Sequence, residues 1–239
     1  MLKHRFPPTS LALLLFFFAF SSKAQPVNNE VKIIGAMKNV MWKGQLSSTI
    51  HLDTIASKQH LYGLGPVEGL AGELLIMDGK SYQSTVLTPT TMKVEETFHV
   101  KAPFFGYANI EKWTEQSLPD TVQTIAQLEA FLNRITTNAK RPFLFKLVGE
   151  VKKATIHVVN LPKGTVVRSP DDAHKGQVNY NLANEPAEML GFFSTEHKAV
   201  LTHHDTFLHI HLITANRQMM GHLDAATFQK GMKLYLPAQ

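Results

Sequence analysis

The chain has 239 residues, with 24 Lys and Arg against 19 Asp and Glu, and it has no Cys. That length can bury a sizeable core in one domain or in two closely joined halves. Without Cys, disulfides and thiolate metal sites are excluded, so any metal must be bound by His and carboxylates. No block of Lys and Arg with interleaved aromatics indicates nucleic-acid binding.

The first 24 residues form a segment of their own. Lys3, His4 and Arg5 precede the apolar run LALLLFFFAF, and small residues follow in SSKA. This order is typical of a secretory signal peptide, here cut after Ala24. A transmembrane anchor is the alternative, but the run is shorter than the roughly 20 residues that a bilayer requires. We therefore expect an exported protein, periplasmic or secreted, with no membrane attachment after processing and a charge close to neutral.

The elements expected after this segment are short helices at first and mostly strands later. A glycine-rich stretch of turns over 63–72 leads into a hairpin whose Asp78-Gly79 turn joins two strands. We expect helices over 37–42, 50–56 and 120–137, a loop over 163–177, and strands over 73–77, 81–86, 93–101, 143–149, 150–162, 177–183, 189–196, 207–215, 221–229 and 233–237. This order predicts an α+β fold in which sheets dominate the second half.

The clearest helix is expected over residues 120–137. Asp120 or Thr121 can act as its N-cap, because a short polar side chain accepts a hydrogen bond from the first free N–H groups. Its apolar side chains fall on one stripe, which is formed by Val122, Ile125, Leu128, Leu132 and Ile135.

The segment FLHIHLITANRQMMGH, residues 207–222, carries three histidines. In an extended strand alternate side chains share a face, so His209 and His211 point to a common space while the leucines and Ile210 point to the core. His222 follows a turn and can return on the adjacent strand. Three imidazoles with a vacant fourth position are typical of a catalytic zinc site.

A half-exposed strand that is merely rich in histidine is the alternative, because His-x-His alone is a weak pattern. His203 and His204 precede the strand, and we interpret them as solvated loop residues. Three imidazoles would also accept copper, nickel or iron.

The histidine segment resembles the zinc-binding segment of the alpha-acetolactate decarboxylase family, with His-x-His, a short turn with Arg, and Gly-His. The stretches LYGLGPVEGLAGELLIMDGKSYQ, KAPFFGYANIEKW, PFLFKLVGEV and LGFF are similar to the family's in order and spacing. The resemblance covers most of residues 31–237.

This resemblance implies one compact α+β domain over 25–239, mostly antiparallel or mixed β, built from two sheet-containing halves of about 25–139 and 140–239. It implies decarboxylation of (S)-2-acetolactate to (R)-acetoin, with zinc as the electron sink for the enediolate. His209, His211 and His222 would bind the zinc, and Glu73 would donate the proton. Glu68 lies nearby on the loop, and we interpret it as a solvated surface acid.

Two features depart from the family's pattern. The family holds the substrate carboxylate with an arginine on a central strand; here Lys146 stands in that place, with His157 as a weaker candidate, and Lys cannot form the two-pronged pair that Arg forms. Lys146 can equally be an outward strand residue. The chain also ends LYLPAQ, without the family's acidic residue after its final Leu-Pro.

These departures keep other functions open. The same histidines could serve a metal-dependent lyase or hydrolase for another small oxo- or hydroxy-acid, or a metal-binding homologue that is catalytically impaired or a non-catalytic binding module. We expect a small-molecule substrate and no nucleic-acid partner, and the exposed strands are compatible with a homodimer.

Overall fold

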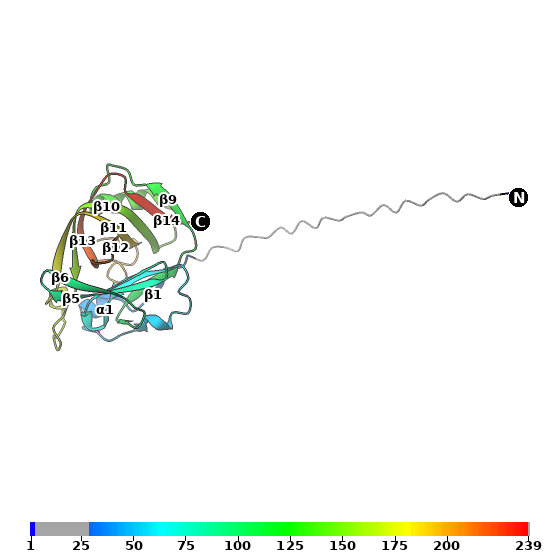
Figure 1. Cartoon of the computed structure of the whole chain (residues 1–239). Helices are drawn as coiled ribbons and strands as arrows, with labels where there is room; N and C mark the ends of the chain where they lie inside the picture. The colour runs from blue at the N-terminus through cyan, green and yellow to red at the C-terminus, as the bar shows by residue number, and fades with distance from the viewer. Residues whose placement is uncertain (3–28, 239) are drawn as a thin grey trace.

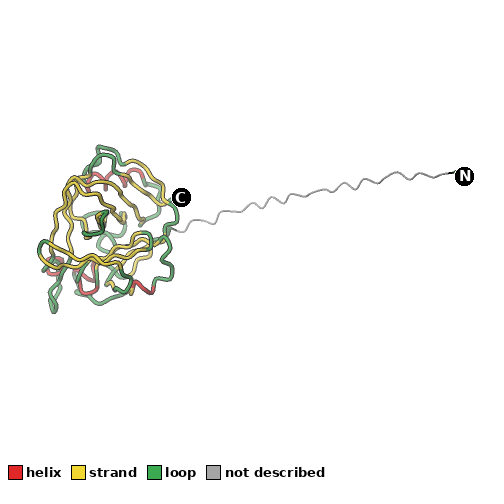
Figure 2. The backbone as a smooth tube through the Cα atoms, in the orientation of Figure 1, coloured by secondary structure: helices red, strands yellow, loops and turns green. Residues whose placement is uncertain are grey.

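Residues 1–2 and 29–238 of a computed structural model are described here, and they form two antiparallel sheets that face each other (Figure 1). Most of the predicted signal peptide, residues 3–24, lies outside these described residues. Strands and loops make up most of the backbone and helices are few (Figure 2), which confirms the predicted α+β class. None of the helices in the described part of the chain is long and apolar enough to cross a membrane.

The first sheet is built from the first half of the chain. Its strands lie in the order β1 (Lys32–Ile34), β8 (Phe105–Asn109), β3 (Leu61–Pro66), β4 (Glu73–Met77), β5 (Lys80–Thr88) and β6 (Thr91–Glu96). The predicted Asp78-Gly79 turn joins β4 to β5. Two short strands from the same half of the chain, β2 (Ile50–His51) and β7 (Lys101–Ala102), form a separate two-stranded sheet.

The second sheet closes on itself. Its strands lie in the order β11 (Val178–Phe193), β12 (Leu208–Thr214), β13 (Met220–Phe228), β10 (Phe143–Val158), β14 (Lys233–Pro237) and β9 (Trp113–Ser117), and β10 also pairs with β11. The β10–β11–β12–β13 ring leaves none of these four strands as a free edge there. β9 comes from the predicted first half yet joins this sheet.

Strand β10 is one continuous strand where the sequence suggested two. Gly149 remains paired with Ala187 on β11. Its φ is +156°, and an added Cβ would lie 2.9 Å from the Met232 sulfur. This glycine therefore permits close packing within the strand and does not end it. The two strands predicted over 177–183 and 189–196 are likewise a single strand, β11.

The predicted glycine-rich turns also begin with a strand. Gly63 lies in β3, paired with Tyr107 of β8, and an added Cβ would lie 2.7 Å from the Gly106 carbonyl oxygen. The glycine is needed because the backbones approach too closely for a side chain.

The helices are fewer and shorter than the sequence indicated. α1 (Met37–Met41) lies where expected, but the predicted helix over 50–56 is the short strand β2 followed by a 3-10 turn at Leu52–Thr54. α2 (Ile125–Ile135) begins later than predicted, because Thr124 and Gln127 form a reciprocal capping box. A short helix, α3 (Pro170–Ala173), interrupts the predicted loop.

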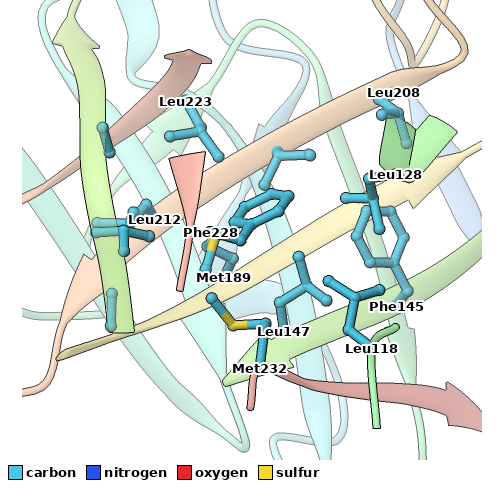
Figure 3. Packing of buried hydrophobic residues seen from close by; sticks show 14 of the residues in the cluster. Leu118, Leu128, Phe145, Leu147, Met189, Leu208, Leu212, Leu223, Phe228 and Met232 are labelled. Atoms are coloured by element: carbon cyan, nitrogen blue, oxygen red, sulfur yellow. The ribbon is translucent and has the colours of Figure 1, made fainter. Parts of the chain in front are cut away.

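Two apolar layers position the site. One fills the closed second sheet, where side chains of its strands meet Leu118 and Leu128 (Figure 3). The other lies between the two sheets and joins Leu75 and Met77 of β4 to Leu190, Phe192 and Ile213 of the second sheet. The polar residues described next lie beside this second layer.

Candidate metal centre

Strand β12 directs its histidines toward the first sheet. Leu208, Ile210 and Leu212 pack inside the closed sheet, while Ile213 packs between the two sheets. His209 and His211 share the face of Ile213 because side chains alternate along a strand. The alternation read from the sequence is therefore present, and both imidazoles are buried, with residue exposures of 4% and 0%.

The neighbouring strand β13 brings the third imidazole into place. His222 is paired directly with His211 of β12. Gly221 before it permits this approach, because a Cβ there would lie 2.4 Å from the carbonyl oxygen of His157. One ligand nitrogen from each of His209, His211 and His222 lies within 4.8 Å of the other two. The structure thus brings together the three histidines that the sequence singled out.

Hydrogen bonding leaves these imidazoles free to bind a ligand. The Nδ1–H of His209 donates to the carbonyl oxygen of Leu201 at 2.9 Å, which fixes the tautomer and leaves Nε2 with a lone pair. Neither ring nitrogen of His211 has a hydrogen-bond partner among the described residues, although both are buried. Buried polar atoms are nearly always satisfied. A cation bound by the three imidazoles would supply the missing partner.

Burial keeps the three imidazoles neutral. Desolvation lowers the pKa of His209 to about 3, and it holds the pKa of His211 and of His222 well below the ordinary value of 6.5. The neighbouring imidazoles, His157 among them, lower these values further. The nearby backbone of Leu74 acts in the opposite direction and raises the pKa of His211, although it does not form a hydrogen bond with the ring. Neutral imidazole is the form that binds a metal ion, so the donor set fits a divalent cation.

Glu73 faces the histidines from the opposite sheet. It begins β4 and is 3% exposed. Its Oε2 lies 3.6 Å from His211 Nε2, and its Oε1 lies 3.9 Å from His157 Nε2 and accepts a 3.3 Å hydrogen bond from the Val159 N–H. Burial raises the pKa of this carboxyl well above 4.5, outweighing the Val159 hydrogen bond that lowers it. Burial therefore favours the protonated form of Glu73 next to the imidazoles.

A fourth imidazole and its carboxylate were only partly foreseen. His157 of β10 stacks on His222 with ring centroids 4.7 Å apart, and its Nδ1 lies 2.7 and 2.9 Å from the two oxygens of Asp224. Asp224 is a site residue that the sequence analysis did not assign, although its spacing of two from His222 puts both on one face of β13. His157 had been considered only as a group to hold the substrate carboxylate.

The cavity around these groups has an apolar wall. Met37 and Met41 of α1 line it together with Phe104, and Pro66 and Val159 complete this side. Two further imidazoles also line it, those of His174 and His203. The interpretation of His203 as a solvated loop residue is therefore incomplete: its side chain is 31% exposed and its ring lies 5.6 Å from that of His222.

Lys146 does not lie among these residues. It lies eleven residues before His157 on the continuous strand β10, near the opposite end of that strand. The two side chains line different cavities. Its Nζ lies over the rings of Tyr62, Trp113 and Tyr235, at 5.6, 5.1 and 4.7 Å from their centroids. None of the described residues that line the histidine cavity is Lys or Arg.

Glu68 is also separate from the histidines. Its Oε1 accepts a 2.8 Å hydrogen bond from the backbone N–H of Ser48, and the carboxylate is partly buried. This acid anchors the loop before it, so it is more than a solvated surface group.

The fold and the cavity define a class of protein, a two-sheet protein with a buried three-histidine site for a divalent cation and an acid beside it. The family model described as alpha-acetolactate decarboxylase matches residues 34–236. The chain belongs to this family, and membership supports a decarboxylase of acetolactate in general. No curated protein sequence matches the chain significantly.

Solved structures show the same fold. The alpha-acetolactate decarboxylase from Bacillus subtilis strain 168 aligns with a TM-score of 0.69 and 18% identity, over 87% of this chain and 86% of that one. The acetolactate decarboxylase from Bacillus subtilis subspecies spizizenii aligns with a TM-score of 0.70 and 19% identity, also over 87% of this chain and 86% of that one. A Staphylococcus aureus protein of unknown function, similar to alpha-acetolactate decarboxylase, aligns with a TM-score of 0.70 and 16% identity, again over 87% of this chain and 86% of that one.

Proposed function

We propose that this chain is a zinc-dependent decarboxylase that converts (S)-2-acetolactate to (R)-acetoin. The observation that carries the proposal is the convergence of His209, His211 and His222 beside one cavity, with the Glu73 carboxyl 3.6 Å from His211. Membership of the alpha-acetolactate decarboxylase family supports the same chemistry.

The three imidazoles would hold the metal ion. When bound, zinc would act as a Lewis acid for the negative charge left on the substrate as CO2 departs, without changing oxidation state. The chain's own contribution is to present neutral donors: burial keeps the imidazoles unprotonated, and Leu201 fixes the tautomer of His209.

Glu73 would deliver the proton that replaces CO2. Its raised pKa favours the protonated form that can donate, and its position at the start of β4 limits it to one side of the cavity. A proton delivered from a single side gives a single stereoisomer, in agreement with the (R) product that we propose.

The apolar wall would favour departure of the carboxylate. Met37, Met41 and Phe104 line the cavity, and no Lys or Arg stands among its described lining residues. An anion placed against these side chains loses water contacts, whereas neutral CO2 does not need them. The missing arginine therefore removes a group that orients the substrate and leaves the proton donor and the metal ligands in place.

The same absence favours a second candidate function. A cavity without a cationic side chain is less selective for the acetolactate carboxylate, so another small oxo- or hydroxy-acid could be the substrate. Side-by-side turnover of acetolactate and of related 2-hydroxy-3-oxo acids distinguishes the two candidates.

Acetoin formation from racemic acetolactate tests the proposal. Zinc-loaded protein should produce acetoin above the spontaneous rate, should consume only one enantiomer and should give the (R) product. Metal-free protein and the Glu73→Gln variant serve as controls. Production at the spontaneous rate by the zinc-loaded chain would overturn the acetolactate assignment.

We also propose export after Ala24 and assembly as a homodimer. Strands β1 and β6 end the first sheet and offer unpaired backbone groups to a second copy. The intact mass of the exported chain should correspond to a start at Gln25, and light scattering should give twice the mass of one chain. A full-length chain or a monomer would refute the respective proposal.

A further inference from the structure

A second group of metal-binding side chains lies at the surface next to the histidine cavity. His203, His204 and Asp205 each offer a ligand atom within 4.8 Å of the other two. They lie between β11 and β12, where His204 and Asp205 are exposed and His203 is half-buried. We call these three residues the surface triad.

The surface triad already has much of the geometry that a cation needs. A tetrahedral ion with bonds of about 2.0–2.2 Å separates neighbouring donors by about 3.3–3.6 Å. The His203 Nδ1 lies 3.1 Å from the Asp205 Oδ1. His204 is exposed, and its ring lies against those of Trp42 and His203, with centroid distances of 5.8 and 5.2 Å.

The backbone fixes the surface triad relative to the interior site. The N–H of His203 donates to the carbonyl of Leu208 at the start of β12, at 3.1 Å. Two residues before His203, the Leu201 carbonyl accepts the hydrogen bond from His209. One short segment therefore positions both the surface donors and one imidazole of the interior site.

A continuous row of imidazoles joins the surface triad to the interior. The ring centroids are 5.2 Å apart for His204 and His203, 5.6 Å for His203 and His222, and 5.1 Å for His222 and His209. Exposure falls along this row, from the exposed His204 to the His209 side, which is buried. His203, His209 and His222 all line the cavity, so an ion that enters from the surface triad meets an imidazole at each step.

We propose that the surface triad is a second, weaker site for a divalent cation of the zinc class, from which the ion passes by way of His203 to His222 and the interior. The transfer exchanges ligands without any change of oxidation state. The surface site stands on its own geometry, and only the transfer step rests on the interior metal centre proposed above.

Metal stoichiometry and uptake rate test this proposal. The test variant is the double substitution His204→Ala with Asp205→Asn, and the matched control is His99→Ala with Asp53→Asn. The control removes an exposed His–Asp pair whose Nδ1 and Oδ2 atoms are 3.5 Å apart. Among the described residues, no third metal-binding side chain lies close enough to complete a site with this pair. Equilibrium dialysis against zinc gives the number of ions, and stopped-flow mixing of metal-free protein with zinc held by a weak chelator gives the rate.

The wild type and the control should bind one tight and one weak ion, and the test variant only the tight one. Uptake into the interior should slow by about tenfold in the test variant, at the lower end of what losing a supporting group near a metal costs. Two ions and an unchanged rate in the test variant would overturn the proposal. Circular dichroism should show all variants folded.

The His211→Ala variant separates this inference from the proposed function. If it loses the tight ion and keeps the weak one, both sites stand as described. If it keeps the tight ion, the interior assignment fails while the weak ion still tests the surface triad. If it loses the weak ion alone, the surface assignment fails.

Discussion

Two polar regions between the sheets differ in how their buried groups are satisfied. At one end of β10, Lys146 lines an open cleft of about 680 Å³ with Glu188 and Arg217, and its ammonium rests on three aromatic rings. At the other end, His157 leads into the histidine cavity, where His211 is fully buried with no hydrogen-bond partner in the described chain.

The difference shows which region is built to receive a ligand. Lys146 is half-buried, and although desolvation lowers its pKa, contacts with aromatic faces stabilise the cation and the cleft stays open to water. The ring nitrogens of His211 are buried without a hydrogen-bond partner among the described residues, which costs roughly 1–3 kcal/mol for such an atom. A metal ion bound as proposed above would offset that cost.

The largest effect is expected from removing His211. The His211→Ala variant should lose the interior ion, with affinity falling by at least about 100-fold, because two imidazoles cannot replace a three-ligand site. Metal analysis after dialysis measures this, and exposed His51→Ala should keep its zinc. An unchanged tight ion in His211→Ala would place the centre elsewhere.

Replacing the acid beside the metal should act on turnover alone. Glu73→Gln preserves the shape of the side chain but cannot donate the proton, so turnover should fall by about 10²–10⁴-fold while zinc content is unchanged. Glu68→Gln is the matched control, since Glu68 accepts a hydrogen bond from the Ser48 N–H and does not line the histidine cavity. Turnover within twofold of wild type for Glu73→Gln would remove Glu73 from the reaction.

Acid should destabilise the metal-free protein through the same imidazoles. The unfolded chain binds protons at His209, His211 and His222 below about pH 6.5, whereas the folded chain keeps them neutral toward the pKa of about 3 at His209. Stability is therefore complete above pH 6.5 and is lost as the pH falls below it. Glu73 opposes this above pH 4.5, because its raised pKa makes the folded chain hold a proton that the unfolded chain releases.

Because three imidazoles lose stability as the pH falls and only one carboxyl gains it, the free energy of unfolding should follow the histidines. The free energy of unfolding should fall between pH 6.5 and 4.5 by about 1 kcal/mol per pH unit for each uncompensated imidazole. Thermal unfolding of metal-free protein at pH 7 and pH 5 measures it, and His211→Leu should show a shallower fall. Equal melting temperatures at both pH values for the wild type would contradict the neutral, buried state of the imidazoles.

The smallest effect is expected at Lys146. Lys146→Met removes the charge and retains a side chain for the aromatic rings, so stability should change by less than about 1 kcal/mol. Zinc content and turnover should stay within twofold of the wild type, because Lys146 and the histidines line different cavities. A tenfold loss of turnover would restore Lys146 as the group that holds the substrate carboxylate.

The sequence predicted the three clustered histidines and the acid beside them. His209 and His211 follow from alternation along β12, and Glu73 from the resemblance to the decarboxylase family. His157 and Asp224 could not be assigned in this way, because their contact depends on the register between β10 and β13. Lys146 was assigned to the substrate carboxylate because the family has an arginine in the matching place on this strand, and a resemblance of position does not show which cavity the side chain lines.

The same limit explains the errors in the fold. Gly63 and Gly149 resemble chain breaks in the sequence, yet each lies within a strand where a neighbouring segment leaves no room for a Cβ. Close approach between segments is a tertiary property, and one residue's conformational freedom does not reveal it. The overall class was predictable because the alternation of apolar residues repeats across many strands.

Anomalous diffraction at the zinc edge from zinc-loaded crystals tests the central claim most directly. We predict a strong peak between the side chains of His209, His211 and His222, about 2.0–2.1 Å from one nitrogen of each. The absence of a peak within bonding distance of His211, in crystals whose bulk zinc content is at least one ion per chain, would contradict the account.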